Sequence, residues 1–185
     1  VFLLRRLQLC DGANVVCGRG VYGKMKALVN TGVEALEYLD HLDPVLKVGE
    51  ELVHIQYSGI CGSDMHAFLG HDARRPIPII LGHEASGTII GGPRDGILVT
   101  INPLNGCGKC AACMAGRSNI CPDRQIISMP PRAGAFADMV AIPSDNLLVV
   151  PRQDLLQSAA LTEPLACGWH AARLGLRLQN DPVSG

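Results

Sequence analysis

The apolar residues of this chain recur mainly with a period of two, which is typical of β-strands. In the clearest such segment, residues 51–57, the side chains of Val53, Ile55 and Tyr57 are predicted to lie on one face of a strand. Residues 34–44 alternate apolar and acidic side chains, a pattern that suits either a strand or a short helix. Turn residues bound the other predicted strands, at residues 25–29, 86–90, 97–102, 134–143 and 147–150.

The period changes to that of a helix near the C-terminal end. One helix is predicted from Pro164 through Leu174, and Glu163 stands just before it. The helix dipole alone favours an acidic side chain at that point, so a helix-start role and a metal-binding role are both open for Glu163. A shorter helix before it is indicated by four apolar residues at helical spacing: Leu155, Leu156, Ala159 and Ala160.

The composition is that of one globular domain. Among 185 residues, 48% are apolar, while 21 glycines and 12 prolines favour short strands and many turns over a helical bundle. The predicted fold class is therefore α+β, mainly β with a few helices. The net charge of −1 gives no reason to expect a nucleic-acid or membrane-surface partner, and no apolar run reaches the length of a membrane span.

Four of the eight cysteines have the spacing of a metal site, C-x2-C-x2-C-x7-C: Cys107, Cys110, Cys113 and Cys121. Four thiolates without a histidine close a tetrahedral shell, which suits a structural zinc. A ferredoxin-type iron–sulfur run has only three residues before its last cysteine, where this chain has seven. Disulfides or free thiols are the remaining alternatives. Because metal-binding thiols need a reducing environment, the cytoplasm is the expected compartment.

A second group of possible metal ligands lies in residues 59–84. Cys61, His83 and Glu84 supply a thiol, an imidazole and a carboxylate, and a catalytic zinc takes three such ligands while one position stays open. The adjacent pair His83 and Glu84 suits a turn, which the preceding glycine can supply. The alternative is a loop cysteine near unrelated histidines. The same stretch holds two spare candidates, His66 and His71.

These motifs resemble, in identity and order, those of the zinc-dependent medium-chain alcohol dehydrogenases. The resemblance covers residues 25–185 and is to the GroES-like β-barrel catalytic domain of that family, with its four-cysteine zinc lobe. An acidic third ligand is similar to the polyol and threonine dehydrogenase branch. The motifs are Gly59-Ile60-Cys61-Gly62-Ser63-Asp64-x-His66, Gly82-His83-Glu84, the four cysteines with Gly116-Arg117-Ser118-Asn119, and Glu163-Pro164-Leu165-Ala166.

The resemblance implies roles for the residues in these motifs. Cys61 and His83 would bind a catalytic zinc, with Glu163 at the third ligand position. Glu84 would either ligate the metal in some states or orient the zinc-bound water. The zinc would stabilise the alkoxide of a secondary alcohol or polyol as a Lewis acid. Ser63 would accept the substrate proton and His66 would carry it to water, unless the first only caps a turn and the second only packs. With the four-cysteine zinc, two zinc ions per chain are expected.

The same resemblance implies NAD or NADP, bound by a domain that this sequence does not contain. No G-x-G-x-x-G follows a predicted strand anywhere in the chain. The catalytic domain is expected at residues 25–178, with the zinc lobe at about 103–124, and residues 179–185 are expected to be a linker toward the absent domain. Residues 1–24 show neither the period of a helix nor that of a strand. They are expected to be a non-native or disordered extension, in which Cys10 and Cys17 have no role.

The full-length protein is expected to be a homo-oligomer that acts on a small-molecule alcohol, and this fragment alone is expected to be inactive. The alternative is a non-catalytic zinc-stabilised module or an inactive truncated remnant. A pure scaffold would need only the four-cysteine lobe, and the complete second ligand group argues against it.

Overall fold

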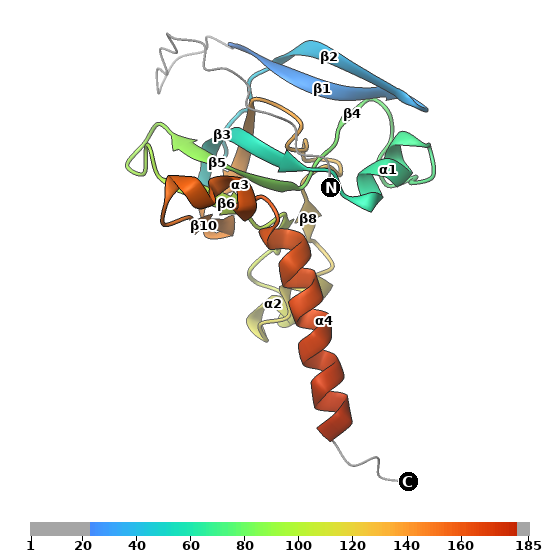
Figure 1. Cartoon of the computed structure of the whole chain (residues 1–185), viewed down its shortest axis with the longest axis vertical. Coiled ribbons are helices and arrows are strands. Elements are labelled where there is room, and N and C mark those ends of the chain that lie inside the picture. Colours follow the sequence, from blue (N-terminus) through green and yellow to red (C-terminus); the bar gives the residue numbers. More distant parts are fainter. Residues whose placement is uncertain (1–22, 181–185) are drawn as a thin grey trace.

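The computed structural model describes residues 23–180 (Figure 1). The expectation for residues 1–24, including Cys10 and Cys17, therefore lies almost wholly outside the described residues. The strands are β1 (Lys24–Gly32), β2 (Ala35–Leu42), β3 (Glu50–Gly59), β4 (Ile79–Ile80), β5 (Glu84–Ile90), β6 (Leu98–Ile101), β7 (Leu104–Asn105), β8 (Gln125–Ile126), β9 (Met139–Pro143) and β10 (Leu147–Val149). The helices are α1 (Gly62–Phe68), α2 (Ala111–Met114), α3 (Leu156–Ala159) and α4 (Thr162–Asn180), with short 3₁₀ turns at Ser118–Ile120, Ser144–Asn146 and Gln153–Leu155.

The described strands pair antiparallel in three sheets. A five-stranded sheet has the order β10-β6-β5-β3-β9, a three-stranded sheet the order β2-β1-β4, and β7 pairs with β8 alone. One apolar core lies under the five-stranded sheet, around Val53, Ile89 and Ile142. A second core joins β1, β4 and α1 to Phe136. The predicted class, mainly β with a few helices, is confirmed.

A β-bulge in β3 corrects one predicted detail. Val53 and Ile55 are buried on the same face, as expected, but Tyr57 is not buried with them. The register with β5 shifts between Ile55 and Tyr57, because Gln56 is an extra residue on β3. The bulge turns Ser58, instead of Tyr57, toward the interior. The bulge thus sets the direction of the last residues of β3, which lead to Cys61.

The predicted strand at residues 134–143 begins only at Met139. Before it, the backbone of Gly134, Ala135 and Phe136 donates hydrogen bonds to the carbonyl groups of residues 80–82. A side chain at Gly134 would collide with the carbonyl group of Leu81, so this close approach requires glycine. The segment therefore packs against the residues that lead into His83.

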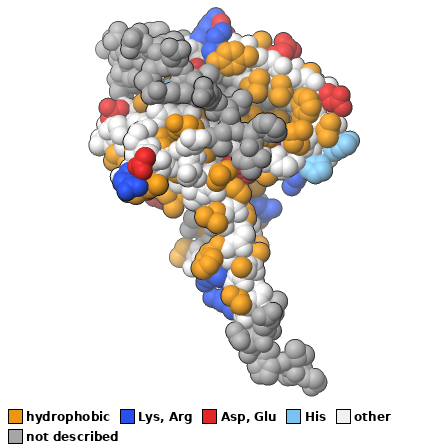
Figure 2. All heavy atoms as spheres, in the orientation of Figure 1, with side chains coloured by type: hydrophobic (Ala, Val, Ile, Leu, Met, Phe, Trp, Pro, Cys, Tyr) orange, Lys and Arg blue, Asp and Glu red, His pale blue; other side chains and the backbone are white. Residues whose placement is uncertain are grey.

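Helix α4 is longer than predicted and includes residues 179–180, which were expected to be linker. It projects away from the sheets as the red helix in Figure 1. Its large apolar side chains include Leu165, Trp169 and Leu176, and all three are exposed. Orange side chains along the projecting part are visible in Figure 2. None of the described helices is long and apolar enough to cross a membrane.

Candidate metal centres

The ends of two paired strands position the first ligand group. Gly59, the last residue of β3, pairs with Glu84, the first residue of β5. Cys61 follows β3 as the N-cap residue of α1. Gly82 has a φ of 92°, a conformation that favours glycine, and this turn delivers His83 and then Glu84 to the strand. The predicted turn before the adjacent ligand pair is thus confirmed, while α1 was not predicted.

Cys61, His83 and Glu84 come together in space. One ligand atom from each of these residues lies within 4.8 Å of the others. His83 and Glu84 are buried, with exposed fractions of 7% and 4%, whereas Cys61 is half-buried. Burial raises the pKa of the Glu84 carboxyl. A side chain at Gly59 would collide with the Glu84 carboxylate, so the absence of a Cβ there leaves room for this ligand.

Asp64 organises this group, and sequence reasoning gave it no role. Its carboxylate accepts hydrogen bonds from the backbone N–H groups of Cys61, at 3.0 Å, and Gly82, at 3.2 Å. Its Oδ1 atom also lies 3.4 Å from the Nδ1 atom of His83, an ion-pair distance whose geometry falls short of a hydrogen bond. Burial lowers the pKa of His83, but the Asp64 carboxylate and the Cys61 sulfur outweigh it and raise that pKa to about 9. One carboxylate thus holds both ligand-bearing segments.

Glu163 approaches the same group from the first turn of α4. It lies outside the tight cluster of three, but its charge contributes to raising the pKa of Glu84. Its Oε1 atom accepts a hydrogen bond from the thiol of Cys167, at 3.1 Å, one helical turn further along α4. This bond is the main cause that raises the pKa of Cys167 to about 11. Cys167 was missed, although its i, i+4 spacing from Glu163 could have pointed to it.

The two residues expected to move a proton lie on α1. Ser63 is half-buried in its first turn, and its hydroxyl and carbonyl oxygens both accept from the guanidinium of Arg75, at 3.5 Å and 3.4 Å. His66 is exposed, one turn after Ser63. His71 is also exposed, and neither histidine belongs to a ligand cluster among the described residues. The structure therefore gives no support to these two histidines as spare ligands.

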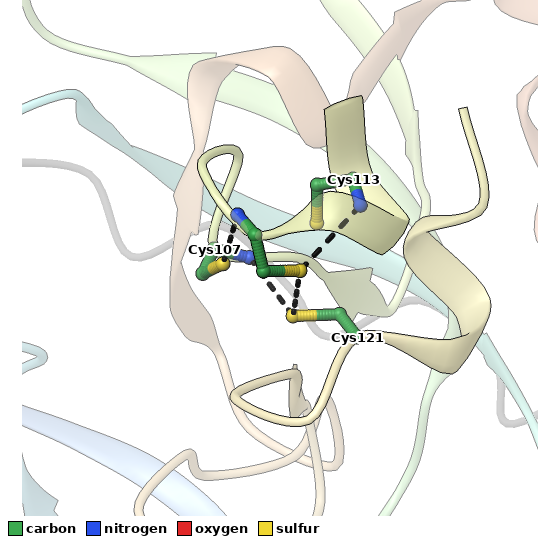
Figure 3. Close-up of side chains that lie close together, drawn as sticks. Cys107, Cys113 and Cys121 are labelled. Carbon is green, nitrogen blue, oxygen red and sulfur yellow. Dashed lines mark hydrogen bonds between the residues drawn. The ribbon is translucent and has the colours of Figure 1, made fainter. Parts of the chain in front are cut away.

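The four cysteines form the second centre, in the lobe that follows β7. Their sulfur atoms all lie within 4.8 Å of one another, and the labelled side chains converge in Figure 3. The sulfur atoms of Cys110 and Cys121 are 3.8 Å apart. Backbone N–H groups of Cys107, Cys110 and Cys113 each donate to a sulfur of the cluster at 3.4 to 3.5 Å. This arrangement favours thiolates, the form that binds metals.

The thiols of the lobe differ in acidity. Backbone N–H groups of Lys109 and Cys110 donate to the Cys107 sulfur and lower the pKa of that thiol to about 7. Burial raises the pKa of the Cys113 thiol to about 11. Cys107 is therefore a more acidic thiol than an ordinary cysteine, and Cys113 a less acidic one.

Both clusters fit zinc by their donor sets. The lobe offers four sulfur donors and no other ligand type, as a closed structural site requires. The first cluster offers one sulfur, one nitrogen and one carboxylate oxygen, with Glu163 nearby, and so leaves a tetrahedral position free. The carboxylate–histidine contact from Asp64 is the outer support that zinc-binding histidines ordinarily have.

Comparison with known proteins places these residues in a family. The alcohol dehydrogenase GroES-like domain model matches residues 47–152. Sorbitol dehydrogenase of Bacillus subtilis is 35% identical over 157 residues, which are 80% of this chain and 44% of that protein. Galactitol-1-phosphate dehydrogenase from Escherichia coli is 30% identical with a TM-score of 0.75, over 82% of this chain and 45% of that structure.

A further solved structure, an alcohol dehydrogenase from Escherichia coli CFT073 in complex with NADH, has 29% identity and a TM-score of 0.69. The match covers 76% of this chain and 42% of the chain in that structure. The chain thus spans less than half the length of the relatives it matches. The family model alone covers more than half of the chain, and the resemblance found in the motifs is confirmed. The chain belongs to the alcohol dehydrogenase GroES-like domain family.

Proposed function

We propose that this chain is the metal-binding catalytic part of an NAD(P)-linked dehydrogenase that oxidises a secondary alcohol or a polyol. The observation that carries the proposal is the convergence of Cys61, His83 and Glu84 within 4.8 Å. The names of the relatives, sorbitol dehydrogenase and galactitol-1-phosphate dehydrogenase, support a polyol or its phosphate as the substrate class. NAD or NADP would be held by a part of the protein outside this chain, as the NADH complex of a longer relative suggests.

Cys61 and His83 would hold a zinc ion, with Glu163 of α4 as the third ligand, while Glu84 would either ligate the metal in some states or orient the zinc-bound water. A zinc ion there supplies Lewis-acid stabilisation for the negative charge that develops on the alcohol oxygen. Asp64 orients the imidazole of His83 through the 3.4 Å contact with its Nδ1 atom. Burial of His83 and Glu84 keeps water from competing with them.

Ser63 and His66 move the proton of the alcohol. The Ser63 hydroxyl oxygen accepts from Arg75 and has a second lone pair that can take the substrate proton, while the hydroxyl's own proton is released toward His66. His66 is exposed at the end of the same helix, where its ring can pass a proton to solvent. The route thus runs along one side of α1, from a half-buried hydroxyl to an exposed imidazole.

Cys107, Cys110, Cys113 and Cys121 would hold a second zinc with a structural role. Because both sites need reduced thiols, we place the protein in the cytoplasm. The complete protein acts on a small-molecule alcohol, and we propose that it does so as a homo-oligomer. Residues 25–178 form its catalytic domain and residues 103–124 its zinc lobe.

Metal analysis of this chain tests the proposal first. Purified protein should contain two zinc ions per chain, and Cys61→Ala should reduce that number to one while the lobe keeps its metal. Folded wild-type protein that binds zinc only at the lobe would contradict the catalytic site. Cys167→Ser is the matched control, because it removes a thiol from the same region while the serine hydroxyl can still donate to Glu163.

Activity is tested in the complete protein that carries this chain. It should oxidise a polyol with NAD⁺ or NADP⁺, and Cys61→Ala should abolish that activity. Ser63→Ala and His66→Ala should slow turnover, the first more than the second, because solvent can replace an exposed proton carrier. A zinc-loaded complete protein without alcohol turnover would instead identify a non-catalytic zinc module.

A further inference from the structure

We propose that Arg75 is a positioning residue of the Cys61 metal site, and that it acts by fixing the first turn of α1. The inference rests on the proposed function, because it assumes that a metal binds Cys61. Arg75 lies in the loop between α1 and β4, and it belongs to none of the motifs identified in the sequence. Its side chain contacts the start of α1, which carries both the proposed ligand Cys61 and the proposed proton acceptor Ser63.

Arg75 is buried almost completely. Its side chain is 2% exposed, and its Nη1 atom lies 2.6 Å from Oδ2 of Asp72, whose side chain is 7% exposed. A buried guanidinium is costly unless it is paired and its N–H groups find acceptors. The Asp72 carboxylate, which also accepts hydrogen bonds from Arg74, faces this guanidinium at one nitrogen, and the other donors of Arg75 reach more distant segments.

Those donors connect two further segments of the chain. The Nε atom donates to the carbonyl oxygen of Ser128 at 3.0 Å, and the Nη atoms donate to the carbonyl and hydroxyl oxygens of Ser63 at 3.4 Å and 3.5 Å. Ser128 is fully buried and has a φ of 65°, an uncommon conformation for a residue other than glycine. Arg75 thus clamps the start of α1 against a fixed point of the interior.

The clamp adds to the contacts that already hold α1, among them the backbone hydrogen bond from Glu34 to the carbonyl of Phe68 and the packing of Ala67 in the second core. Asp64 ties the first turn of this helix to Gly82 and His83, and Arg75 ties it to Ser128. Helix α1 has only seven residues, so its own hydrogen bonds fix its position weakly. With both ties in place, the Cys61 sulfur is held in register with His83, and the Ser63 hydroxyl is held as an acceptor from a permanently charged donor.

Lysine cannot replace arginine in this arrangement. The guanidinium presents donors in a rigid planar fork that serves Asp72, Ser128 and Ser63 at once, whereas an ammonium is a single point charge on a flexible stem. Arg75→Lys keeps the charge that compensates Asp72 but loses the clamp. This variant therefore separates the positioning role from the stability of the buried ion pair.

The test is zinc affinity measured separately at the two sites. Competition with a chromophoric chelator gives the affinity, and ¹¹³Cd NMR of the cadmium-loaded chain gives one signal per site, with the Cys61 signal identified by its loss in Cys61→Ala. We expect Arg75→Lys to weaken the Cys61 site by about tenfold to a hundredfold, as loss of outer support typically does. Its ¹¹³Cd signal should shift or broaden, while the lobe keeps its affinity and signal.

Two further variants keep the outcome decisive. Asp72→Leu combined with Arg75→Met removes both buried charges in favour of apolar side chains, which commonly preserves folding, and it should weaken the Cys61 site as Arg75→Lys does. The matched control is Arg132→Lys. Arg132 forms another ion pair, 2.8 Å from Glu50, with side chains 11% and 5% exposed, and the side-chain partners of its guanidinium among the described residues are Glu50 and Gln125 rather than residues of α1. It should leave the Cys61 site unchanged.

If folded Arg75→Lys binds zinc at the Cys61 site with an affinity within about twofold of wild type, the inference about Arg75 is overturned, while the proposed function stands. Equal losses at both sites in Arg75→Lys would also overturn the inference, because they would reveal a merely structural role. A wild-type chain without metal at Cys61 would overturn the inference and the proposed function together.

Discussion

The Oδ1 atom of Asp64 lies 3.4 Å from the Nδ1 atom of His83. The same carboxylate accepts a hydrogen bond from the backbone N–H of Cys61. Asp64→Asn keeps the size of the side chain but removes the charge that faces the imidazole. We expect it to lower zinc affinity at the Cys61 site by about tenfold to a hundredfold. Chelator competition on the purified chain measures this.

Asp95→Asn is the matched control for that variant. Asp95 accepts a backbone hydrogen bond from Gly91 in an exposed turn, away from either cluster. It should leave zinc affinity at both sites unchanged. Unchanged affinity in Asp64→Asn as well would show that the contact with His83 does not support the metal.

Gly59→Ala should damage the Cys61 site without unfolding the chain. The new methyl group would occupy the space of the Glu84 carboxylate and push that side chain out of the cluster. The expected result is a loss of zinc affinity at this site by at least about tenfold, with the lobe unaffected. Gly62→Ala, whose methyl group would meet no other atom within 4 Å, is the control. A crystal structure of Gly59→Ala with Glu84 in place would refute this explanation.

Stability should fall in acid partly through Asp72. Hydrogen bonds from Arg74, together with the charges of Arg74 and Arg75, lower the pKa of Asp72 from 3.8 to about 2. A carboxyl whose pKa is depressed in the folded state stabilises above its unfolded pKa, and this contribution is lost as the pH falls through the folded value. Asp72→Asn should therefore cost roughly 1–2 kcal/mol at pH 7, and the difference from wild type should vanish as the pH approaches 2.

Urea unfolding at pH 7 and at several values between 4 and 2 measures that difference. Asp154→Asn is a close control, because Asp154 also pairs with an arginine two residues away, but both side chains are 66% exposed. It should change the free energy of unfolding by less than about 0.5 kcal/mol. A cost for Asp72→Asn that stays constant down to pH 2 would contradict the assignment.

Loss of the lobe metal should unfold the lobe alone. Cys110→Ser removes a sulfur that lies beside Cys121 and accepts from the Cys113 backbone. The only sheet in this region is the pair β7–β8, which does not join the larger sheets in the described structure. Hydrogen exchange should show lost protection across residues 104–126, while β3 and β5 stay protected. Loss of protection throughout the chain would show that the lobe is part of the main core.

The residues that the sequence proposed as metal ligands converge in the structure because they sit beside glycines and strand ends that are local in the chain. Cys61, His83 and Glu84 lie within 24 residues of one another, and the lobe cysteines within 15. Tyr57 was misplaced because a bulge inserts Gln56, and a period of two cannot reveal an inserted residue. The residues that support the site were missed for a different reason, since their roles depend on contacts between segments that are distant in sequence.

Arg75 illustrates this limit. Its nearest acceptor, Asp72, is local, but Ser128 is 53 residues away, and nothing in the residue types announces that pairing. Asp64 is a similar case, because its contacts with Gly82 and His83 join segments 18 and 19 residues apart. A pattern of side-chain types identifies donors for a metal. It does not identify the neighbours that orient them.

The pairing of Gly59 with Glu84 has a consequence for how this site can change over evolution. The two ends of the ligand group are fixed by the register of β3 and β5, and the 24 residues between those strands form α1, the short strand β4 and connecting loops, all outside the five-stranded sheet. Insertions and deletions in that excursion can alter the entrance to the site while the ligands stay in place. Homologues should therefore vary in the spacing between cysteine and histidine, and a search that fixes this spacing would overlook them.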